Sequence, residues 1–135
     1  MPLASFFFVG SPEDASRNDG LRGSCPVDRA EFFRVTDISL ESLYKAIEGT
    51  EVARFRPVVM SDDYAQVTFV FPKDFIERLS NINNSQRSNI VSAWHRSGES
   101  PYDNENDLHT LLCELVRLAQ LAQATERLMY LWNSL

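Results

Sequence analysis

The chain alternates short aromatic or β-branched runs with longer stretches in which apolar residues recur every third or fourth position. The runs are typical of strands and the stretches of amphipathic helices. Strands are predicted at residues 5–9, 31–36, 55–60 and 65–71. A brief helix is predicted to open at Pro12, with longer helices over residues 38–49, 72–82, 83–97 and 105–125. The pattern indicates an α+β fold, with a small mixed or antiparallel sheet packed on one face against several amphipathic helices.

Residues 127–134 fit two patterns. Leu128, Tyr130 and Trp132 alternate as in a strand, whereas Leu128, Leu131 and Trp132 also suit one face of a helix. We expect a strand, with a helix as the alternative. The sheet is then built from residues 5–9, 65–71 and 127–133, within one domain that covers residues 1–135.

Several local signals set the expected boundaries. Ser39 is predicted to cap its helix, with Ile38 and Leu43 as a hydrophobic staple across the cap. Asn83 and Gln86 have the spacing of a capping box. Pro57 restricts its strand to a sheet edge or to the strand's first residue.

Two segments are predicted to be turns or loops. Asp62 and Asp63 lie between two predicted strands, so they are interpreted as turn residues rather than a catalytic carboxylate pair. Residues 18–29 carry Gly20, Gly23 and Pro26 with few apolar residues, which predicts a mobile surface loop.

Charge and length narrow the functional classes. Acids outnumber bases 19 to 13, for a net charge of −6. Nucleic acid is therefore not expected as a partner. The negative charge suits either a basic protein partner or, as we prefer for the charge alone, only the solubility of the protein. No apolar run approaches the roughly 20 residues that cross a bilayer. The two cysteines, Cys25 and Cys113, are too few for a disulfide framework, so we expect a reducing, cytoplasmic setting.

The stretch SPYDNENDLHTLLCEL, residues 100–115, is the one place where metal-ligating residue types gather. Asp103, Glu105, Asp107 and Glu114 fall on positions that a calcium loop uses, but Leu108 stands where that loop needs glycine. Because leucines continue a helical pattern through the stretch, we interpret it as the start of a helix with acids at its positive end. No metal and no cofactor are predicted.

Histidine and cysteine offer a second metal hypothesis. His109 and Cys113 are four residues apart and share a helical face, but zinc needs four ligands and the chain lacks a further paired motif. Cys113 is therefore interpreted as a small core residue. His95 lies near a helix end, and no nucleophile motif accompanies it.

The arginines of ARFRP, residues 53–57, share one side of a possible edge strand. They suit either a phosphate-binding patch or, as we prefer, charges that protect an edge from aggregation. The candidate binding residues of the whole chain are Trp94, His95, Glu99, Asp103, Glu105, Asp107, His109, Arg54 and Arg56.

The order of the elements carries a resemblance. SFFFV, DISLESLYKAIEG, VTFVFPKDFIERL and LLCELVRLAQLAQATERLMYLW follow one another along most of the chain. That order resembles small, uncharacterised bacterial α+β proteins of the YfbM-like kind. The resemblance implies a fold and carries over no catalytic residues.

These observations lead to two functional hypotheses. The first is a non-catalytic, acidic, cytoplasmic protein-binding module, for example an inhibitor or immunity-type partner of a basic protein. The alternative is a small enzyme or a ligand- or metal-binding protein that uses His95, Glu99, His109 and the loop at residues 100–107. No catalytic residue is assigned in either case.

Overall fold

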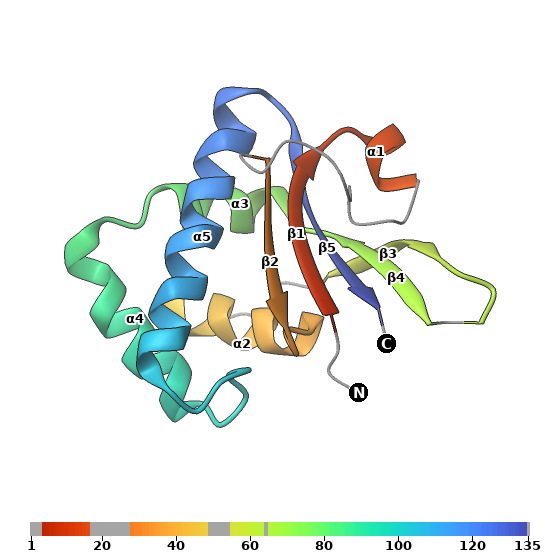
Figure 1. Cartoon of the computed structure of the whole chain (residues 1–135). Coiled ribbons are helices and arrows are strands. Elements are labelled where there is room, and N and C mark those ends of the chain that lie inside the picture. The colour runs from red at the N-terminus through yellow and green to blue at the C-terminus, as the bar shows by residue number, and fades with distance from the viewer. Residues whose placement is uncertain (1–3, 17–27, 49–54, 64, 135) are drawn as a thin grey trace.

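The computed structural model describes residues 4–16, 28–48, 55–63 and 65–134. Strands and helices alternate as far as a pair of consecutive strands at residues 56–70, three helices then follow in succession, and the first and last elements are both strands (Figure 1). The strands are β1 (Ala4–Gly10), β2 (Arg29–Phe33), β3 (Arg56–Met60), β4 (Gln66–Val70) and β5 (Leu128–Ser134). The helices are α1 (Pro12–Ser16), α2 (Asp37–Glu48), α3 (Lys73–Ser80), α4 (Asn84–Arg96) and α5 (Glu105–Ala124).

The five strands form one antiparallel sheet in the order β2-β1-β5-β4-β3. The first and last strands pair along their full lengths, from Ala4 opposite Ser134 to Gly10 opposite Leu128. The α+β prediction is confirmed, as is the strand at residues 127–134. The three strands predicted for the sheet lie side by side at its centre, and β2 and β3 extend it at the two edges.

The four longer helices cover one face of the sheet (Figure 1). The face is apolar because alternate residues of the central strands, among them Phe7 and Leu131, point toward the helices and are fully buried. The apolar stripe predicted for α5 is buried throughout: Leu108, Leu111, Leu112, Leu115, Val116, Ala119 and Ala122. No helix in the described part of the chain is long and apolar enough to span a bilayer.

The opposite face of the sheet is also apolar. Phe6 and Trp132 are cross-strand partners with ring centroids 5.1 Å apart, and Phe8 stacks on Tyr130 at the same distance. All four rings are buried, together with Ala15 of α1, which lies on this side of the sheet (Figure 1). The helical stripes predicted one covered face, and this aromatic cluster shows that the other face is buried as well.

Helix boundaries follow local hydrogen bonds. Asn83 and Gln86 form the predicted capping box at the start of α4. The prediction that Ser39 caps α2 is wrong. The helix begins at Asp37, and Thr36 is the cap, because its Oγ1 accepts a hydrogen bond of 3.2 Å from the Ser39 backbone N–H. The staple is wrong too, since Ile38 in the first turn is 61% exposed.

Strand β2 also differs from its predicted range of residues 31–36. It begins at Arg29 and ends at Phe33, where Arg34 has a positive φ of 63° that breaks the extended backbone. Arg29 was assigned to the predicted loop at residues 18–29 and is instead in the sheet. Residues 18–27 lie outside the described residues.

The turn between β3 and β4 contains Asp62 and Asp63, as predicted. The Asp63 carboxylate accepts hydrogen bonds from Ser61 Oγ at 2.7 Å and from the Ala65 N–H at 3.1 Å. The Ser61 hydroxyl, and secondarily the Ala65 N–H, hold the pKa of Asp63 below its ordinary value, because both favour the charged form.

Replacing Ser61 with alanine should therefore raise the pKa of Asp63 toward its ordinary value. The folded state favours the carboxylate, so the stability that this turn contributes is present above the unfolded pKa of Asp63 and is lost as the pH falls through its folded pKa. An NMR titration of the Asp63 carboxyl carbon measures the change, with Ser16→Ala as a distant control. An unchanged Asp63 titration in Ser61→Ala would contradict the assigned hydrogen bond.

Candidate functional site

The stretch at residues 100–115 starts a helix, as predicted. Asn104 is the N-cap of α5, and its side chain accepts a hydrogen bond of 2.7 Å from the Asn106 N–H. Leu108 lies within α5 and is fully buried. The backbone is therefore helical at the position where a calcium loop would turn sharply. Among the residues that the structure describes, no group of three or more His, Cys, Asp or Glu side chains could hold a metal ion.

The acids of this stretch lie on the surface at the positive end of α5. Asp103, Glu105 and Asp107 are all exposed. Glu105 accepts a hydrogen bond of 3.1 Å from Ser92 Oγ of α4, so its carboxylate is oriented toward the neighbouring helix. The helix dipole favours negative charge at this position, and the exposed carboxylates are accessible to a partner.

His95 joins the end of α4 to the start of α5. Its Nε2 lies 2.8 Å from the carbonyl oxygen of Asp103. Since a carbonyl oxygen only accepts, Nε2 carries the proton in this contact. His109 has a different partner, the Cys113 thiol, so the two histidines are engaged in separate contacts.

Tyr102 ties the connection between α4 and α5 to the edge of the sheet. Its hydroxyl donates to the Phe33 carbonyl at 2.7 Å and accepts from the Phe33 N–H at 3.3 Å. Burial raises the pKa of Tyr102. No local sequence pattern marks Tyr102 as a contact residue, because its partner is 69 positions away.

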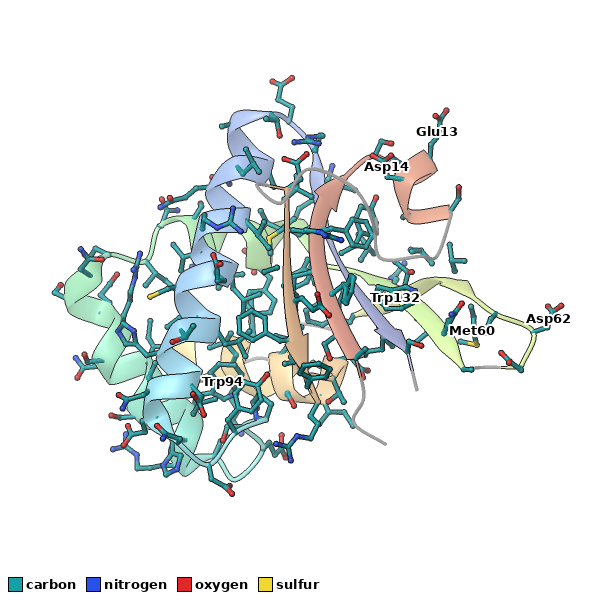
Figure 2. The ribbon with its side chains drawn as sticks, viewed as in Figure 1. Glu13, Asp14, Met60, Asp62, Trp94 and Trp132 are labelled. Carbon is teal, nitrogen blue, oxygen red and sulfur yellow. The ribbon has the colours of Figure 1, made fainter. Side chains whose placement is uncertain are left out.

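Trp94 corrects one binding prediction. Its side chain is fully buried between helices (Figure 2), so it offers no surface to a partner. The indole Nε1–H donates to the Ser39 carbonyl at 3.1 Å and to Ser42 Oγ at 2.9 Å. These two hydrogen bonds therefore join α4 to α2.

A groove of about 570 Å³ adjoins this contact, since Ser42 is one of its lining residues. We call it the α2–α4 groove. Its lining comes from α2, from α4 and from the turn that follows: Ile38, Glu41, Ser42, Lys45, Ala46, Ala93, Ser97 and Glu99. Glu99, a predicted binding residue, lines this groove together with the exposed Ile38. The groove thus combines apolar side chains with two carboxylates and one ammonium group.

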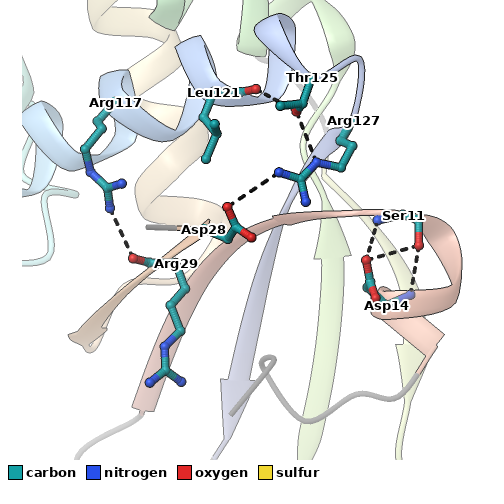
Figure 3. Close-up of polar contacts among 8 residues, drawn as sticks. All are labelled: Ser11, Asp14, Asp28, Arg29, Arg117, Leu121, Thr125 and Arg127. Atoms are coloured by element: carbon teal, nitrogen blue, oxygen red, sulfur yellow. Dashed lines mark hydrogen bonds and ion pairs between the residues drawn. The ribbon is translucent and has the colours of Figure 1, made fainter. Parts of the chain in front are cut away.

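The C-terminal half of α5 and the residues that follow it are held to the start of β2 and lie near the start of α1 (Figure 3). Arg117 donates to the carbonyl of Arg29 at 3.1 Å, and Arg127 forms an ion pair with Asp28 at 3.5 Å. Nearby, Lys73, Glu77, Glu126 and Arg127 surround a second hollow of about 530 Å³. Acids and bases balance there, so this hollow has less charge selectivity than the α2–α4 groove.

The arginine patch is only partly described. Arg54 lies outside the described residues, and Arg56 is exposed at the start of β3. Strand β3 is an edge strand, as Pro57 predicted, and a bulge interrupts its pairing between Pro57 and Val59. Proline and a bulge both hinder the addition of another strand, which supports the edge-protection interpretation.

Cys113 is not the core residue that the sequence predicted. Its thiol is only half-buried, and it contacts the Arg87 guanidinium and the His109 ring. The helical pattern placed Cys113 beside the buried Leu112 but could not show these two polar neighbours.

Comparisons of the chain with protein-family models, with curated proteins and with solved structures gave no significant match. The resemblance to YfbM-like proteins therefore stays a prediction.

Proposed function

We propose that this chain is a non-catalytic, acidic protein-binding module whose α2–α4 groove receives a basic segment of a partner protein. The segment presents an apolar side chain to Ile38 and a lysine or arginine to the carboxylates of the groove. An inhibitor or immunity-type protein of the cytoplasm is a role of this kind. The observation that carries the proposal is an exposed isoleucine beside two carboxylates in a groove.

Ile38 supplies the apolar part of the proposed contact. It is 61% exposed, although Leu40 and Leu43 of the same helix are fully buried. Covering its exposed surface would contribute about 25 cal/mol per Å² of apolar area removed from water. Ala93 lies in the same lining, so an apolar side chain would contact both helices.

Charge supplies the selectivity. Glu41 and Glu99 outnumber Lys45 in the lining, and the whole chain carries a net charge of −6. The exposed Asp103, Glu105 and Asp107 at the start of α5 add to the negative field. Such a field speeds the encounter with a basic partner and disfavours an acidic one.

The floor of the groove is held in place before any partner arrives. The Trp94 indole is bonded to Ser39 and Ser42, and Ser42 itself lines the groove. Tyr44 of α2 also donates a hydrogen bond to Asp74 of α3. A surface that is already ordered loses less conformational entropy on binding.

A random peptide library selected against the immobilised protein tests the proposal. The expected enriched peptides place an apolar residue next to lysine or arginine. Ile38→Asp and Glu99→Lys should each weaken binding of the enriched peptides about tenfold or more, equivalent to about 1.4 kcal/mol. The affinity should also fall as salt concentration rises, because the carboxylates are accessible to ions.

Matched control variants change the same residue types elsewhere. Met60→Asp alters an exposed apolar residue of β3, and Glu13→Lys alters an exposed acid of α1. Both should bind the enriched peptides as the parent protein does. Enrichment of acidic peptides, no enrichment at all, or an equal loss in Met60→Asp and Ile38→Asp would each overturn the proposal.

A further inference from the structure

A thiol, an imidazole and a guanidinium meet where α4 packs on α5. Cys113 Sγ lies 3.5 Å from His109 Nδ1, one helical turn earlier on α5. Arg87 Nη1 of α4 donates to the same sulfur at 3.3 Å. We propose that Cys113 is a reactive thiol that hydrogen peroxide or a similar small peroxide oxidises to a sulfenic acid.

The two neighbours are groups of the kind that assist a cysteine nucleophile. A thiolate is the nucleophilic state of cysteine, and a nearby arginine stabilises it by charge and by hydrogen bonding. His109 Nδ1 lies close enough to take the thiol proton, which is the arrangement of a nucleophile beside a general base. Arg87 approaches from another helix, so this environment exists only in the folded protein.

One N–H group of the Arg87 guanidinium has no acceptor in the structure. Its Nε is buried and has no hydrogen-bond partner, although a buried N–H without an acceptor is unfavourable. Nε belongs to the same planar guanidinium that contacts the sulfur. Oxidation would place an acceptor oxygen on the sulfur that this guanidinium contacts. A hydrogen bond from the guanidinium to that oxygen would favour the oxidised product.

The reaction balances with peroxide as the only oxidant. His109 accepts the thiol proton, and the sulfur attacks one peroxide oxygen. An S–O bond forms as the O–O bond breaks, and the sulfur gives up two electrons to the leaving oxygen. The leaving hydroxide takes the proton from His109, so one thiol and one hydrogen peroxide give one sulfenic acid and one water. Cys113 is only partly buried, so we expect a molecule of this size to reach the sulfur.

Kinetics on the full-length chain with Cys25→Ser test the proposal, because Cys113 is then the single thiol. Iodoacetamide alkylation and peroxide oxidation, followed by dimedone labelling, are measured by mass spectrometry at neutral pH. We expect native Cys113 to react about tenfold faster than the same residue in chain unfolded by guanidinium. This comparison needs no substitution in the cluster.

Variants assign the effect to its two neighbours. Arg87→Gln and His109→Gln should each slow both reactions severalfold, and Arg87→Lys should retain part of the rate because it keeps the charge. Arg96→Gln, at the exposed end of α4, is the matched control and should change nothing. A native rate below the unfolded rate, or Arg87→Gln and His109→Gln proteins that react as fast as the parent, would overturn the proposal.

Discussion

Trp94→Ala is expected to lower the free energy of unfolding by about 3–5 kcal/mol, the usual cost of emptying the site of a buried aromatic side chain. Trp94 has no exposed surface and is among the largest fully buried side chains of the described residues. The substitution leaves a cavity between α2 and α4 and removes the donor that Ser39 and Ser42 share. Chemical denaturation at equilibrium measures the loss.

Trp94→Phe separates the two contributions. Phenylalanine fills most of the space but cannot donate, so its expected cost is about 1–3 kcal/mol. Ser97→Ala, at the C-cap of the same helix, is a control for substitutions in this region that leave the core intact. A cost below about 1 kcal/mol for Trp94→Ala would contradict the buried position of the indole and the rigid floor of the groove.

Trp132→Ala should also lower the free energy of unfolding by about 3–5 kcal/mol, but in a different part of the protein. Trp132 is 1% exposed and belongs to the aromatic cluster on the sheet face opposite the four longer helices. Its edge-to-face contact with Phe6 adds about 0.5–1.5 kcal/mol beyond the area that it buries. Equilibrium denaturation again gives the value.

Phe33→Ala is the matched control for the aromatic cluster that contains Trp132. Phe33 is also an aromatic residue of the sheet, but it is 49% exposed at the end of an edge strand, so its removal should cost about 1 kcal/mol or less. Equal losses for Trp132→Ala and Phe33→Ala would show that the second sheet face is not a packed core.

Most of the fold could be predicted from the sequence, because strong periodicity and local caps act between near neighbours. The leucines of α5 recur at helical spacing and are buried as that spacing requires. Asn83 and Gln86 are three residues apart, so their capping box is visible in the sequence. The alternation of Leu128, Tyr130 and Trp132 gave the strand that pairs with β1.

The candidate site could be predicted only in part, because it depends on choices that sequence patterns leave open. Thr36 and Ser39 are both competent caps, and selecting Thr36 starts α2 earlier and turns Ile38 outward. Trp94 is an aromatic residue on a helix, and the pattern does not say whether another helix covers it.

Contacts between distant positions were beyond the sequence analysis. Arg87 and Cys113 are 26 residues apart, and Phe33 and Tyr102 are 69 apart. Neither pair has a spacing that marks a contact, because both depend on how α4 and α5 pack on each other and beside β2. Glu99 and the acids at the start of α5 could be named in advance as accessible charges, whereas the groove that gives Glu99 its setting required the packed helices.

Amide chemical shifts measured during titration with an enriched basic peptide show whether the α2–α4 groove is the binding surface. We expect the largest shifts in α2 around Ile38 and Glu41, in α4 around Ala93 and in the following turn at Glu99, with a change at the indole N–H of Trp94, which is bonded to Ser42 of the groove. Largest shifts in β3, or around Lys73 and Glu126 at the second hollow, with an unchanged Trp94 indole signal, would contradict it.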